Sequence, residues 1–245
     1  MKMKTQFIFY PLTLIAALLI LTCTREQEPA QYSFVPIEFN PDLTYGTITD
    51  QEGNTYKTIT IGTQTWMAEN LKVTKYRNGD PIPNLDASED WDELTTGACC
   101  YFNNESIFFN IYGMLYNWYA INDSRNIAPS GWHVPTFDEW TTLVDFLGGE
   151  ESSRFRLMEQ GSYHWSPPTH GKNDSGFTAL AAGALKTDSI RNGFCCIASE
   201  AYFWSSDDDS TNSAWNLSIK PSYDIKVFYT NKKTFAFSVR CIKDD

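Results

Sequence analysis

The residues of this chain best suited to covalent or metal chemistry are its cysteines. Apart from Cys23, they form two adjacent pairs and one single residue: Cys99 with Cys100, Cys195 with Cys196, and Cys241. Neighbouring residues of a strand point to opposite faces, so each pair can offer at most one sulfur to a given partner. We predict a disulfide between one residue of the first pair and either one residue of the second pair or Cys241. Because five is an odd number, at least one thiol is free or pairs between molecules.

The acidic run that begins at Asp207 is the second place where chemistry is expected. Asp207, Asp209 and Asn212 follow a predicted strand, and clustered oxygens in a loop are the ligands that Ca²⁺ prefers. The spacing differs from that of an EF-hand, and a solvated acidic loop is the alternative. The cysteine pairs lack the two-residue gap of a zinc ribbon. We therefore predict no cofactor apart from calcium, with these three residues as its candidate ligands.

The histidines and the common catalytic motifs indicate no reaction. The chain has 3 histidines, His133, His164 and His170, and none belongs to a visible Ser-His-Asp motif. The sequence shows no phosphate-binding loop and no dinucleotide fingerprint. We expect His133 to be structural, and we predict that the protein is not an enzyme.

Aromatic residues make up 15% of the chain. Large rings favour half-buried pleated surfaces, and exposed rings often serve in recognition because they stack on sugar faces. We predict Trp165, Trp204 and Trp215 as the residues that contact a ligand. The alternative for each ring is a place in the core.

The N-terminal residues have the pattern of an export signal. A short basic start precedes an apolar run over 7–21, which is about 15 residues long and too short for a comfortable membrane span. The run ends in Ile20-Leu21-Thr22-Cys23, which resembles the lipobox of bacterial lipoproteins except at Thr22. We predict a signal peptide over 1–22 and lipidation of Cys23. A plain secretory signal is the alternative.

Residues 23–42 are polar, contain prolines and show no sustained period, which is typical of an extended tether. Acidic Glu26 and Glu28 resemble the surface-export signals of some Bacteroidetes lipoproteins. The formal net charge of -11 disfavours phosphate backbones, so no nucleic-acid partner is expected. We expect a cell-envelope protein that is anchored in the outer membrane by lipid alone and is exposed at the surface.

Short extended runs at both ends of the domain predict antiparallel strands. Residues 43–50 and 55–61 are rich in β-branched side chains and flank a turn, so they predict a hairpin. Further strands are predicted over 201–206, 214–219, 225–229 and 235–242. The last of these places alternate apolar residues on one face: Phe235, Phe237, Val239 and Cys241.

Helices are predicted between these strands. Thr136 with Glu139 forms a capping box, apolar residues follow at helical spacing, and Gly148-Gly149 supplies the stop. Further helices are expected over 112–122 and 150–160. This order of elements predicts an α+β domain with small antiparallel sheets, two or three short helices and long loops.

Several segments match one family in their order along the chain. They include Ile61-Gly62-Thr63-Gln64-Thr65-Trp66-Met67-Ala68-Glu69-Asn70-Leu71, Gly131-Trp132-His133-Val134-Pro135-Thr136, Ser175-Gly176-Phe177, Tyr202-Phe203-Trp204-Ser205-Ser206 and Ser238-Val239-Arg240-Cys241. Together they resemble the Fibrobacter succinogenes major paralogous domain (FISUMP), common in lipoproteins of Bacteroidetes, over about residues 45–243 of a domain that we place at 43–245. The resemblance implies a cell-surface setting and, more distantly, the C-type lectin-like fold. It implies no reaction.

These observations predict a non-catalytic binding or adhesion module whose partner is a surface glycan or an envelope protein. A structural subunit of an envelope assembly is the alternative. A metal enzyme of the formylglycine-generating type, which uses paired cysteines and copper, is a third hypothesis, and no such active-site motif can be matched in the chain.

Overall fold

The computed structural model describes residues 35–161, 163–166, 171–187, 192–221 and 228–245. The predicted signal peptide over 1–22, the lipidation residue Cys23 and His170 lie outside these residues. The unit described here spans Val35–Asp245. Residues 35–42, which the sequence assigned to the tether, therefore belong to this unit.

A five-stranded sheet holds both ends of the unit together. Its order is β1 (Gly46–Thr49), β2 (Thr55–Ile61), β3 (Gln64–Met67), β12 (Ile242–Lys243) and β6 (Trp132–His133), and all its pairs are antiparallel. The predicted hairpin is confirmed as β1 and β2. Its turn begins at Asp50, whose carboxylate accepts from the amides of Glu52 and Asn54. This is the usual way in which an aspartate starts a turn.

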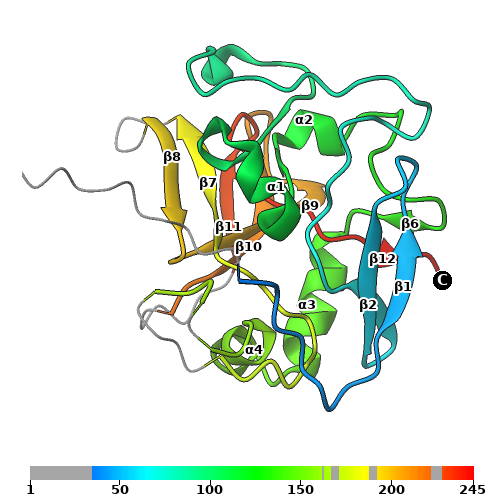
Figure 1. Ribbon diagram of the computed structural model, residues 1–245. Coiled ribbons are helices and arrows are strands. Elements are labelled where there is room, and N and C mark those ends of the chain that lie inside the picture. Colours follow the sequence, from blue (N-terminus) through cyan, green and yellow to red (C-terminus); the bar gives the residue numbers. More distant parts are fainter. Residues whose placement is uncertain (1–34, 162, 167–170, 188–191, 222–227) are drawn as a thin grey trace, which may run out of the picture. The chain divides into compact units, whose positions relative to one another are not determined.

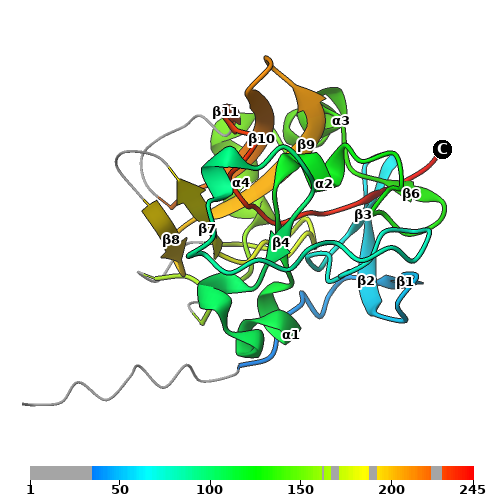
Figure 2. The same cartoon turned by 90° about the horizontal axis from the view of Figure 1, so that it is seen from above.

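The other sheets are smaller. β9 (Ala201–Asp208), β10 (Ser213–Ile219) and β11 (Phe228–Lys232) form a three-stranded antiparallel sheet. β7 (Ala182–Thr187) pairs with β8 (Asn192–Ile197), and β4 (Cys99–Cys100) pairs with β5 (Leu115–Tyr116). In both views the five-stranded sheet and the β7–β8 hairpin lie on opposite sides of the unit, with β8 at the outer edge (Figures 1 and 2).

The helices are short: α1 (Phe109–Tyr112), α2 (Trp118–Ile121), α3 (Phe137–Phe146) and α4 (Glu150–Leu157), with 3-10 turns η1 (Trp91–Glu93), η2 (Phe102–Asn104) and η3 (Ser106–Phe108). The capping box at Thr136 and Glu139 is confirmed. The single helix predicted over 112–122 is wrong. Gly113 interrupts it with a φ of 71°, in a conformation that favours glycine, and Asn117 then caps α2.

The last predicted strand, 235–242, is a strand only at its end. Its middle residues form isolated bridges with three different segments, namely Ala236 with Leu185, Phe237 with Tyr116, and Ser238 with Phe203. Figure 2 shows this segment in red as it crosses the unit towards the five-stranded sheet. The predicted alternation is nevertheless correct, because all four of its apolar residues lie in one core cluster.

Three clusters of buried side chains hold the elements together. The central core includes Tyr56, Cys99, Tyr116, Trp118, Ala184, Tyr202, Trp204, Phe235, Phe237, Val239 and Cys241. The aromatic core includes Trp66, Trp140, Trp165, Phe177 and Phe203, and the lateral core includes Trp91, Cys100, Phe102, Phe108 and Leu115. Each large apolar side chain buried in this way contributes about 1.5–3 kcal/mol. The predicted α+β class with small antiparallel sheets and short helices is confirmed.

Candidate functional site

A polar groove lies on the described surface where segments far apart in the sequence meet. Its volume is about 330 Å³, and it is lined by Asp92, Glu93, Leu94, Thr95, Tyr119, Asn212, Lys232 and Thr234. These residues come from η1 and the loop after it, from α2, from the turn between β9 and β10, and from β11 and its C-terminal side. We call it the Tyr119 groove. Its volume lies within the usual range of small-molecule sites, about 300–1,000 Å³.

Backbone hydrogen bonds join the segments of the Tyr119 groove. The Trp118 amide donates to the Lys233 carbonyl, and the Lys233 amide donates to the Asn212 carbonyl, each at 2.9 Å. The buried Lys233 ammonium lies 4.2 Å from the centre of the Trp118 ring and 2.8 Å from an Asp208 oxygen. These contacts fix the backbone that carries Tyr119 and Asn212.

Asp92 is the most heavily bonded group of the groove. Its carboxylate accepts from the Lys232 ammonium at 2.9 and 3.1 Å, from the Thr187 hydroxyl at 3.0 Å and from the Thr234 hydroxyl at 3.4 Å. The hydrogen bond from Lys232 is the main reason why the pKa of Asp92 lies below its usual range. Asp92 is therefore an ionised acceptor at neutral pH. Together with the partly exposed Tyr119 ring, the groove offers hydrogen bonds and a stacking face, and its lining suits a ligand rich in hydroxyl groups.

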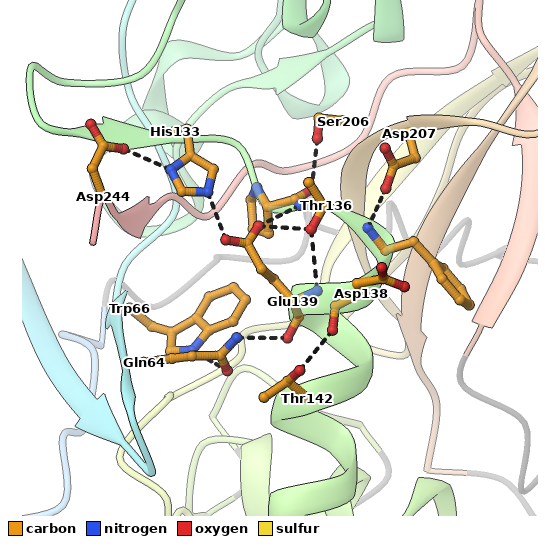
Figure 3. Close-up of polar contacts among 12 residues, drawn as sticks. Gln64, Trp66, His133, Thr136, Asp138, Glu139, Thr142, Ser206, Asp207 and Asp244 are labelled. Atoms are coloured by element: carbon orange, nitrogen blue, oxygen red, sulfur yellow. Dashed lines mark hydrogen bonds and ion pairs between the residues drawn. The ribbon is translucent and has the colours of Figure 1, made fainter.

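A second polar cluster surrounds His133 at the start of α3 (Figure 3). The Nδ1 atom of His133 lies 2.7 Å from an Asp244 oxygen, and Nε2 lies 2.8 Å from a Glu139 oxygen. Because both partners are carboxylates, the arrangement suits a doubly protonated ring. Burial lowers the pKa of His133, but the hydrogen bonds to Asp244 and Glu139 outweigh burial and raise it above its ordinary value.

Glu139 also positions the first turn of α3, together with Asp207. The second Glu139 oxygen accepts from the amide and the hydroxyl of Thr136, and Asp207 accepts from the Phe137 amide (Figure 3). A groove of about 250 Å³ lies beside this cluster and is also lined by Glu139 and Asp244. Both nitrogens of His133 are occupied by these contacts, and its structural role stays a prediction.

The predicted ligand contacts differ in their surroundings. Trp165 and Trp204 are each 0% exposed, so neither can touch a ligand at the surface. Their indole nitrogens donate to the carbonyls of Ala179 and Tyr116. The prediction is wrong for these two rings because both fill the core. Trp215 is half-buried and its ring centre lies 4.7 Å from that of Phe137.

The residues predicted to bind calcium have separate partners. Asp207 accepts from the Phe137 amide at 2.5 Å, and Asp209 accepts from the Ser213 hydroxyl at 3.4 Å. Asn212 lines the Tyr119 groove. In the described part of the chain, no group of three or more His, Cys, Asp or Glu side chains is arranged to hold a metal ion. The geometry therefore gives the calcium prediction no support.

The predicted long-range disulfide is absent from the described residues. Cys99, Cys100 and Cys241 are buried free thiols. The Cys99 thiol lies 3.8 Å from the Ile82 carbonyl oxygen, in the central core, while Cys100 faces the lateral core. In the second pair, the Sγ atoms of Cys195 and Cys196 lie only 2.7 Å from each other.

His164 connects the start of the unit to its body. Its Nδ1 atom lies 2.7 Å from a Glu159 oxygen, and its Nε2 atom lies 3.1 Å from the Val35 carbonyl oxygen. The other Glu159 oxygen accepts from the Glu38 amide at 2.8 Å. Both His164 and Glu159 are buried. These bonds attach residues 35–38, which the sequence assigned to the tether, to the domain.

One family matches most of the chain. Residues 59–243 match the Fibrobacter succinogenes major domain. The chain belongs to this family. The sequence-based family assignment is confirmed, and the match lies within the predicted range of about 45–243. Comparison with curated proteins and with solved structures found no match to this chain.

The motif residues of this Fibrobacter succinogenes major domain mostly build its core. Arg240 is 0% exposed and donates to the Asn70 side chain at 2.6 Å and to the carbonyls of Met67, Phe177 and Thr178. Burial lowers its pKa to about 9. Trp66 and Trp140 pack with ring centres 4.6 Å apart. Several of the motifs that identify the family therefore serve packing. Tyr119 lies in the segment over 112–120, which also resembles the family, but its residue type alone did not predict that it would line a groove.

Within the described ranges, none of the helices combines the length and the apolar character that a membrane span requires.

Proposed function

We propose that this protein is a surface lipoprotein whose Fibrobacter succinogenes major domain binds glycan without catalysis, and that the Tyr119 groove is the binding site. The observation that carries the proposal is the composition of this groove. One partly exposed aromatic ring, that of Tyr119, lies among an ionised carboxylate, an ammonium, an amide and hydroxyl groups. Sugars present hydroxyl groups at their edges and apolar faces that stack on rings, so this lining matches their chemistry.

The surface favours a glycan over a large protein interface. Among the described residues, the exposed large hydrophobic side chains are Ile107, Phe146 and Tyr163, at 44, 59 and 66%. Stable protein interfaces need a buried apolar centre, and contiguous apolar patches usually mark them. Each exposed side chain comes from a different segment, which is ordinary for a monomeric surface.

The envelope location rests on the sequence alone. The apolar run over 7–21 and Cys23 support export and lipidation, and the acidic composition fits a soluble exposed domain. The C-type lectin-like relationship is part of the same proposal. Incorporation of labelled palmitate into the full chain, and its loss in Cys23→Ala, tests the anchor. Unlabelled protein in the cytosolic fraction would contradict it.

Binding can be tested with the full chain in detergent on a glycan array, followed by calorimetry on any glycan retained. We expect Tyr119→Ala and Asp92→Asn to weaken binding at least about tenfold, because each removes a principal contact worth about 1.4 kcal/mol or more. The matched control is Tyr163→Ala, which removes an exposed tyrosine outside the groove and should leave binding unchanged. Repeating the measurement with EDTA separates a calcium-dependent site from the calcium-free binding expected here.

Two results would contradict this proposal. Binding that survives both groove substitutions places the ligand elsewhere on the domain. A single envelope protein trapped by crosslinking in cells, with no glycan retained on the array, would favour the structural-subunit alternative.

A further inference from the structure

The hairpin of β7 and β8 is distorted at its cysteine pair. Ala184 pairs with Cys195 and Ala182 pairs with Ile197, so Cys196 lies opposite Gly183. Cys196 has a φ of 69° and Gly183 a φ of 68°, the left-handed region in which a cysteine is uncommon. A Cβ atom on Gly183 would lie 2.4 Å from the Cys195 carbonyl oxygen. The two strands are therefore so close here that only glycine fits at position 183.

The turn after β8 holds Cys196 in this conformation. The Cys196 carbonyl accepts from the amides of Ser199 and Glu200 at 3.1 and 2.9 Å, and from the Ser199 hydroxyl at 3.0 Å. The left-handed residue turns its side chain to the same side as that of Cys195, and both pack against the central core. The prediction that adjacent cysteines point apart is therefore wrong for this pair, because it assumed a regular strand.

The two sulfur atoms are close together, and both residues are partly exposed. The sulfurs lie 2.7 Å apart, in direct contact. Both cysteines are partly exposed, unlike Cys99, Cys100 and Cys241. The sulfurs need to approach by less than about 1 Å to reach the length of an S–S bond, about 2.05 Å.

Polar groups border the pair. The Lys186 ammonium donates to the Tyr202 hydroxyl at 3.0 Å, and Tyr202 donates to the Glu200 carboxylate. Burial lowers the pKa of Lys186, while the nearby Cys195 and Cys196 act in the opposite direction. Thiol chemistry is favoured beside a cation because the thiolate is the reacting form.

We propose that Cys195 and Cys196 are a reversible redox site that forms a disulfide between adjacent residues by exchange with an external disulfide, either a protein disulfide or glutathione disulfide. One cysteine thiolate attacks the external disulfide, a mixed disulfide forms, and one external thiolate leaves. The neighbouring thiolate then attacks the protein sulfur of the mixed disulfide, the Cys195–Cys196 bond forms, and the second external thiolate leaves. The pair loses two electrons, the external disulfide is reduced to two thiols, and the two protons of the cysteines end on those thiols.

The bond is expected to be easily reduced. Adjacent Cα atoms are about 3.8 Å apart, less than the 4.4–6.8 Å that most disulfides span. Strained and exposed disulfides are the labile ones that serve regulation or catalysis. The site therefore responds to the thiol–disulfide balance around the protein, which goes beyond the glycan binding proposed above and does not depend on it.

Mass mapping of the full chain in detergent tests the proposal. The protein is equilibrated in buffers of different ratios of reduced to oxidised glutathione, blocked with N-ethylmaleimide and digested. In oxidising buffer we expect the peptide with both cysteines to be lighter by two hydrogen masses and free of maleimide, and in reducing buffer to carry two maleimides. Cys99, Cys100 and Cys241 serve as internal controls and should remain thiols that react only after denaturation.

Single variants test the second step. Cys195→Ser and Cys196→Ser each lack the neighbouring thiol that closes the ring, so the remaining cysteine should accumulate as a glutathione adduct in oxidising buffer. The proposal is overturned if the wild-type pair keeps a glutathione adduct, bonds to another cysteine, or carries two maleimides at every glutathione ratio. The peptide masses of the wild-type protein test the proposal even if a variant fails to fold.

Discussion

The two adjacent cysteine pairs of this chain look alike in sequence and occupy different environments in the fold. Ala98-Cys99-Cys100-Tyr101 contains a regular strand, β4, whose two sulfurs point into different core clusters. Phe194-Cys195-Cys196-Ile197 lies at the end of β8, where one left-handed residue brings both sulfurs to the same side. The two pairs therefore differ in the backbone conformation of their second cysteine. The left-handed Cys196 brings its sulfur into contact with that of Cys195, whereas the sulfurs of Cys99 and Cys100 point apart.

Burial makes the first pair inert as well. It raises the pKa of the Cys99 thiol to about 12 and holds that of Cys100 well above its usual range. At neutral pH both residues remain thiols, and the thiolate is the nucleophile. The second pair packs against the central core but is only partly buried.

The largest expected difference lies in alkylation rates. In reducing buffer, Cys195 and Cys196 should react with iodoacetamide at least about a thousandfold faster than Cys99 and Cys100, because a buried thiol reacts only through unfolding that costs about 5–15 kcal/mol. Quenched labelling followed by peptide mass spectrometry measures both rates in one sample. Similar rates for the two pairs would show that β4 opens easily, and the comparison would fail.

Serine substitutions in the two pairs should lower the free energy of unfolding by different amounts. Cys99→Ser leaves a hydroxyl in the central core and is expected to lower the free energy of unfolding by about 1–3 kcal/mol. Cys195→Ser, at the partly exposed site, should change it by no more than about 0.5 kcal/mol. Urea unfolding of both variants in reducing buffer provides the measurement. Equal losses would mean that β8 is as tightly packed as β4.

Alkaline pH should weaken the fold through Cys99. The unfolded chain releases this proton near the ordinary pKa of 9.0, whereas the folded chain keeps it up to about 12. The free energy of unfolding is therefore unaffected by this group below about pH 9 and falls above it, by up to about 1.4 kcal/mol per pH unit. Urea unfolding at about pH 8 and about pH 10 should show a smaller decline for Cys99→Ala than for wild type. An unchanged decline would remove Cys99 as a cause.

The smallest effect concerns the left-handed residue. Cys196→Gly should be more stable than Cys196→Ala by about 1 kcal/mol, because glycine adopts a φ of 69° without the penalty of a Cβ atom. Thermal unfolding of the two variants in reducing buffer measures the difference. The matched pair Cys100→Gly and Cys100→Ala should show the opposite order, since glycine weakens a regular strand. If alanine is the better residue at 196, the turn does not hold this conformation in solution.

Local signals in the sequence were sufficient for several elements. The hairpin of β1 and β2, the capping box at Thr136 and the apolar face of residues 235–241 follow from side chains within a few positions of one another. The family could also be assigned, because its motifs contain the large rings and the buried Arg240 that fill the core. Each of these features depends on short-range geometry or on residue type alone.

Tertiary structure alone decided the candidate sites. Asp92, Tyr119, Asn212 and Lys232 meet in one groove only because backbone bonds between distant segments bring them together. Trp204 had the residue type of a ligand contact and is buried by its packing against Phe237. Exposure and proximity are set by how whole elements pack, and no spacing along the chain encodes them. The amino-acid order determined which side chains were available, and the folded contacts determined which of them reach the surface.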